Sequence, residues 1–65
     1  MKSQAAKLLA AKHSMHFHYV PKWKLWGLYH IENLERPAEY ISARQLREFS
    51  EKEFLHLISL VRGGV

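Results

Sequence analysis

The sequence contains no cysteine, no aspartate and no threonine. Without cysteine, neither a disulfide framework nor a thiolate metal site can stabilise the chain, so the fold has to depend on apolar side chains. The same absences exclude Ser–His–Asp and Cys–His catalytic arrangements within the chain, because one member of each is missing. We therefore expect a protein that is not an enzyme and that uses no cofactor.

Long apolar runs and phosphate-binding loops are also missing. The run at Leu8–Ala11 is too short for a signal peptide, and no stretch approaches the ~18 apolar residues of a membrane span. We expect one small cytoplasmic domain over residues 1–65 with no membrane association. A chain this short hides only ~60% of its unfolded surface. Self-association as a homodimer would therefore be a second source of stability.

Acidic residues are absent from the first half of the chain. Residues 1–31 hold five lysines and no Asp or Glu, a formal charge of +5, whereas residues 32–65 combine five cations with six glutamates, −1. A half of one sign attracts anions and repels cations. The asymmetry therefore predicts either an anionic partner for residues 1–31 or lysines that only keep a small domain in solution.

The patterning predicts an α+β fold built on a three-stranded antiparallel sheet. Residues 2–12 are rich in alanine and predict a helix or a partly flexible basic arm. A period of two predicts strands over residues 15–20, 23–31 and 38–42. Capping-box patterns at Ser42 and Ser50 predict C-terminal helices over 43–49 and 51–62.

The apolar faces of these strands predict the core. We expect the longer C-terminal helix to pack on one sheet face, made of Phe17, Tyr19, Trp23, Leu25, Tyr29 and Ile31. An alternative is a three-layer arrangement in which the N-terminal helix covers Trp26 and Leu28 on the opposite face. Gly27, amid bulky residues, indicates a bulge or a close crossing by another element.

What remains of the basic, aromatic stretch is a candidate contact surface for a nucleic acid or a protein. Its proposed members are Lys12, His16, His18, Lys22, Lys24, Trp26 and His30. Cations beside an exposed aromatic ring suit single-stranded nucleic acid, because the cations follow phosphates and the ring stacks on a base.

The same stretch would also suit a metal site or a protein interface. His16, His18 and His30 would form a three-histidine metal site if their strands paired suitably, but no nearby carboxylate would orient the rings, so we predict no metal. The alternative function is a protein-interaction module, a compact regulator or inhibitor of the kind phages and plasmids encode. It would dock on a larger acidic protein with Trp23 and Trp26 as anchors.

Overall fold

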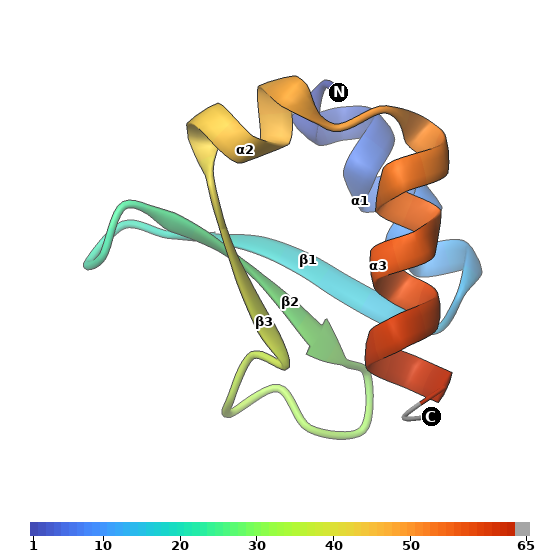
Figure 1. Cartoon of the computed structure of the whole chain (residues 1–65). Helices are drawn as coiled ribbons and strands as arrows, with labels where there is room; N and C mark the ends of the chain where they lie inside the picture. The colour runs from blue at the N-terminus through green and yellow to red at the C-terminus, as the bar shows by residue number, and fades with distance from the viewer. Residues whose placement is uncertain (64–65) are drawn as a thin grey trace.

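An N-terminal helix, three strands and two further helices follow one another along the chain (Figure 1). The computed structural model describes residues 1–63. The elements are α1 (Ser3–Lys12), β1 (Met15–Val20), β2 (Leu25–His30), β3 (Glu39–Ser42), α2 (Ala43–Glu48) and α3 (Glu51–Gly63). The strands form one antiparallel sheet in the order β1-β2-β3. The predicted α+β fold is confirmed, and none of the described helices is long and apolar enough to cross a membrane.

The second strand is shorter than predicted because a four-residue turn occupies its expected start. The Trp23 N–H donates to the Val20 carbonyl at 3.2 Å, and the Lys24 N–H donates to the Pro21 carbonyl at 3.3 Å. Lys24 has a positive φ of 53°, which reverses the chain so that Leu25 pairs with Val20. Trp23 is therefore a residue of the β1–β2 hairpin turn and not of β2.

Reciprocal side-chain hydrogen bonds begin both C-terminal helices, as predicted. The Gln45 N–H donates to the Ser42 hydroxyl at 3.0 Å, and the Ser42 N–H donates to the Gln45 side chain at 2.9 Å. Ser50 and Glu53 form the same pair of bonds at 3.1 and 2.9 Å. These bonds satisfy backbone N–H groups that have no partner inside a helix, so each helix begins where its box places it.

The core lies between the sheet and the helices. Directly paired residues share a sheet face, so the pairs Phe17–Leu28 and Trp26–Ile41 belong to the same face. That face packs against all three described helices. The buried core comprises Ala6, Leu9, Ala10, Met15, Phe17, Leu28, Ile41, Leu46, Phe54 and Ile58. The described chain thus has two layers, and the three-layer alternative is wrong.

The predicted side of β2 is wrong as well. Leu25 and Tyr29 lie on the face opposite to Phe17, together with His16 and His18. Trp23, in the turn, is 53% exposed, and Ile31, just after β2, is 60% exposed. The physical reason is that β2 carries large apolar residues on both faces, so its own pattern does not decide which face the helices cover.

Candidate functional site

The structure distributes the predicted contact residues over different parts of the molecule. His16 and His18 lie on the sheet face that the described helices leave uncovered, and Lys22 and Lys24 lie in the hairpin turn. The others are elsewhere: Trp26 and His30 lie on the helix-covered face, and Lys12 ends α1. The prediction that these residues share one surface is therefore wrong for Lys12, Trp26 and His30.

His30 cannot join the other strand histidines at a metal ion. It pairs with Met15, a core residue, whereas His16 pairs with Tyr29 on the uncovered face. The three-histidine set considered from the sequence is therefore not assembled. Within residues 1–63, no group of three or more metal-ligating side chains is placed to hold an ion.

The uncovered side of the sheet, which we call the open face, has a tyrosine ring as its floor. Its strand residues are His16, His18, Val20, Leu25, Gly27, Tyr29, Tyr40 and Ser42. Strand pairing continues through Gly27, so there is no bulge there. A Cβ added to Gly27 would lie 2.7 Å from Cε1 of Tyr29. The space beside this glycine is therefore filled by the ring of Tyr29, two residues further along the same strand, and not by another element as the sequence suggested.

Further rings surround Tyr29. His18 and Tyr40 flank Gly27 on the two neighbouring strands. The imidazoles of His16 and His18 stack with centroids 5.7 Å apart and planes at 21°, and the His16 ring lies 5.9 Å from that of Tyr29. Aromatic and imidazole rings thus extend across all three strands of the open face.

The hairpin turn adds the most exposed ring. The Trp23 indole packs against Tyr40 with centroids 5.4 Å apart and a 56° angle between the planes. Trp23 is 53% exposed and Tyr40 is 37% exposed, so both rings remain accessible to a partner. Sequence reasoning assigned the exposed Trp23 to the core and did not include Tyr40 in the contact surface. It also assigned Tyr29 to the core, and Tyr29 is buried, although on the face that the described helices leave uncovered.

The open face has a positive end and no acidic residue among its strand positions. Lys22 and Lys24 are exposed in the turn that joins β1 to β2. The glutamates nearest to the sheet in sequence, Glu32, Glu35 and Glu39, lie in or beside the β2–β3 loop at the other end of the strands. Figure 1 shows the hairpin and this loop at separate ends of the sheet. Positive charge is therefore concentrated at the hairpin end of the open face, away from these glutamates.

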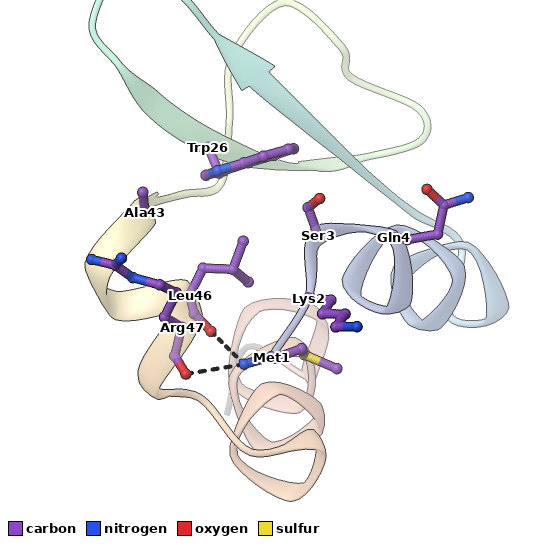
Figure 2. A pocket seen from close by; sticks show the side chains of 8 residues that line it. All are labelled: Met1, Lys2, Ser3, Gln4, Trp26, Ala43, Leu46 and Arg47. Carbon is purple, nitrogen blue, oxygen red and sulfur yellow. Dashed lines mark hydrogen bonds between the residues drawn. The ribbon is translucent and has the colours of Figure 1, made fainter.

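Trp26 packs against other aromatic rings on the helix-covered face of the sheet. Its ring stacks on Phe17 at 4.9 Å with planes 4° apart, and it meets Tyr19 edge-on at 5.2 Å. The Lys7 ammonium lies over the indole, 5.6 Å from the ring centroid. Trp26 is half-buried under the helices and borders a pocket between α1 and α2 (Figure 2).

The amino group of Met1 fastens the start of α1 to the end of α2. It donates to the carbonyls of Leu46 at 2.9 Å, Arg47 at 3.1 Å and Phe49 at 3.0 Å, the first two of which Figure 2 shows. The last carbonyls of a helix carry partial negative charge, so an ammonium there is stabilising. This contact holds one wall of the pocket in place.

Comparison with protein-family models, curated proteins and solved structures finds no match for this chain. The open face is therefore the feature from which a function is inferred.

Proposed function

We propose that this protein binds single-stranded nucleic acid through its open face, without catalysing a reaction on it. One observation supports the proposal above the others. A sheet face left uncovered by the described helices carries accessible aromatic rings, has no carboxylate on its strand positions, and ends at two exposed lysines. The lack of cysteine suits a cytoplasmic setting for this activity, where thiols stay reduced.

The chemistry follows from the two kinds of side chain. Unpaired bases expose flat apolar surfaces, and stacking one on an aromatic side chain contributes ~1–3 kcal/mol. Trp23 and Tyr40 offer such surfaces at the hairpin end of the face. Lys22 and Lys24 supply charges for the phosphates that link those bases. A duplex keeps its bases stacked on each other, so it gains only the phosphate contribution.

A protein partner is the second candidate, and a separate observation favours it. Trp23, which is 53% exposed, Ile31, which is 60% exposed, and the half-buried Leu25 form an apolar strip along the open face and its ends. Exposed apolar surface of this kind is typical of protein interfaces. The partner would be a larger protein with an acidic patch opposite Lys22 and Lys24, or a second copy of this chain.

Titration of labelled oligonucleotides by fluorescence anisotropy tests the proposal. We expect single strands to bind more tightly than duplexes of equal length, with affinity falling steeply from about 50 to about 200 mM salt. Lys22→Glu with Lys24→Glu should abolish this binding while leaving the fold intact. The matched control, Arg44→Glu with Lys52→Glu, makes the same charge change on the helical layer and should weaken binding far less.

The opposite results would exclude the proposal. Absence of binding at low salt, or equal losses in the two double variants, would show that the open face does not bind nucleic acid. Concentration-dependent dimerisation lost in Trp23→Ala and Ile31→Ala would instead assign the apolar strip to self-association.

A further inference from the structure

The outer side of α3 carries an apolar hollow that no other described element covers. Its lining residues are Phe49, Lys52, Glu53, His56, Leu57 and Leu60. Leu60 is 54% exposed, although the inner side of the same helix buries Phe54 and Ile58 in the core. The helix therefore has apolar residues on two sides, and the sheet covers only one of them.

The residues of the hollow have the spacing of a helix-pairing surface. We call four of them the α3 seam: Phe49, Glu53, His56 and Leu60, which follow one another at intervals of four, three and four residues. Alternating steps of three and four are the spacing of the contact positions in a coiled coil. Phe49 precedes the helix but lines the same hollow, so it extends the seam beyond the first turn. A seam of this kind fits a second helix.

The seam is complementary to itself in an antiparallel arrangement. When two copies of α3 cross at its midpoint, Phe49 of one copy is level with Leu60 of the other, because the two residues are equally far from that point. Glu53 is level with His56 for the same reason. Apolar side chains therefore meet at both ends of the seam, and a carboxylate meets an imidazole at its centre. A parallel pair would instead place the two Glu53 carboxylates together and align the helix dipoles.

Both polar residues of the seam are available for these contacts. Within residues 1–63 the one ion pair is Arg44–Glu48, so neither Glu53 nor His56 takes part in one. The Ser50 N–H donates to one carboxylate oxygen of Glu53, Oε1, and leaves Oε2 for a partner. His56 is exposed.

We propose that this chain forms a two-fold symmetric dimer through the α3 seam. The partner is a second copy because the same four residues supply both halves of every contact, as an isologous interface requires. The helix packs on the side of the sheet opposite to the open face, so the open face of each copy stays accessible (Figure 1). The inference does not rest on the proposed function, and each can fail without the other.

Sedimentation equilibrium of the whole chain between about 10 µM and about 2 mM tests the proposal. A single helix face is at the low end of interface sizes, so we expect a reversible dimer with a dissociation constant between about 10 µM and about 1 mM. His56→Glu places a second carboxylate opposite Glu53 and should weaken the dimer at least about tenfold. His56→Lys changes the same exposed position but keeps a cation there, and should retain the dimer.

A second pair of variants separates the seam from other apolar surface. Leu60→Glu should abolish dimerisation, whereas Leu8→Glu makes the same change at a 63% exposed leucine of α1 and should leave it unchanged. The proposal is overturned by a protein that stays monomeric over the whole concentration range. It is equally overturned by equal dimer affinities in His56→Glu and His56→Lys, or by a dimer that survives Leu60→Glu.

Discussion

Lys24 holds a backbone conformation that suits its position in the turn but not its residue type. Its φ of 53° lies in the left-handed region, which costs a residue with a side chain roughly 1–2 kcal/mol and costs glycine little. Ser14, between α1 and β1, has a similar φ of 59°. A strained residue at a contact surface is consistent with a side chain retained for binding. The two positions allow that interpretation to be tested.

Replacing Lys24 with glycine should change stability and binding in opposite directions. Relief of the strained φ should raise the free energy of unfolding by about 0.5–1 kcal/mol, while loss of one phosphate contact weakens oligonucleotide binding and reduces the salt slope by about 0.7. Denaturant unfolding and anisotropy measure the two effects. Ser14→Gly is the control and should raise stability without changing affinity. An unchanged affinity in Lys24→Gly would remove Lys24 from the contact surface.

Gly27 is the residue that allows the Tyr29 ring to lie on the sheet. In Gly27→Ala the new methyl group would lie 2.7 Å from Cε1 and 2.9 Å from the Tyr29 hydroxyl oxygen, so the ring must move away. The ring is the far end of a side chain, and we expect the free energy of unfolding to change by less than about 1 kcal/mol.

Oligonucleotide affinity should fall about three- to tenfold in Gly27→Ala, because the floor of the open face is disturbed. Tyr29→Phe keeps the ring in place and should retain affinity. If both variants bind as tightly as the original protein, Tyr29 is not part of the binding surface.

At the scale of elements, the helix starts could be predicted from the sequence, whereas the orientation of β2 could not. The helix starts were predictable because Ser42 and Ser50 are each followed, three residues later, by the Gln or Glu that completes a capping box. The hydrogen bonds of that motif are local, so they form regardless of the rest of the fold. The side of β2 was not predictable, since Trp26 and Leu28 on one face are as apolar as Leu25 and Tyr29 on the other. Only pairing with β1, which places Leu28 opposite Phe17, determines which face meets the helices.

The capping box of α3 predicts a specific dependence of stability on pH. Hydrogen bonds from the Ser50 backbone N–H, and then from its hydroxyl, lower the pKa of Glu53 below its usual 4.5. The folded protein therefore favours the ionised carboxylate. Its stabilising contribution is complete above the unfolded pKa and is lost as pH falls through the lowered value.

Glu53→Gln keeps the acceptor but removes the titration, as Gln45 does in α2. Thermal unfolding between about pH 6 and pH 3 should show a smaller acid loss for this variant than for the original protein. An identical acid loss in the two proteins would show that Glu53 does not contribute to the pH dependence.

At the scale of the whole molecule, charge and rings are arranged along the sheet. The hairpin end carries Lys22 and Lys24, and the opposite end carries the glutamates of the β2–β3 loop. This separation orients an approaching anion towards the turn and the Trp23 ring beside it. The charge asymmetry was readable from the sequence, whereas its relation to Trp23, Tyr29 and Tyr40 depended on the face that the helices leave uncovered.

The most direct test of the central claim follows the NMR signals of the two tryptophan indole N–H groups, assigned with Trp23→Phe, during titration with a single-stranded oligonucleotide of about eight residues. If the open face binds the strand, the Trp23 signal shifts progressively to saturation, and the shift disappears in Lys22→Glu with Lys24→Glu. A Trp23 signal that stays in place while the oligonucleotide binds would contradict the account, because the strand would then contact another surface.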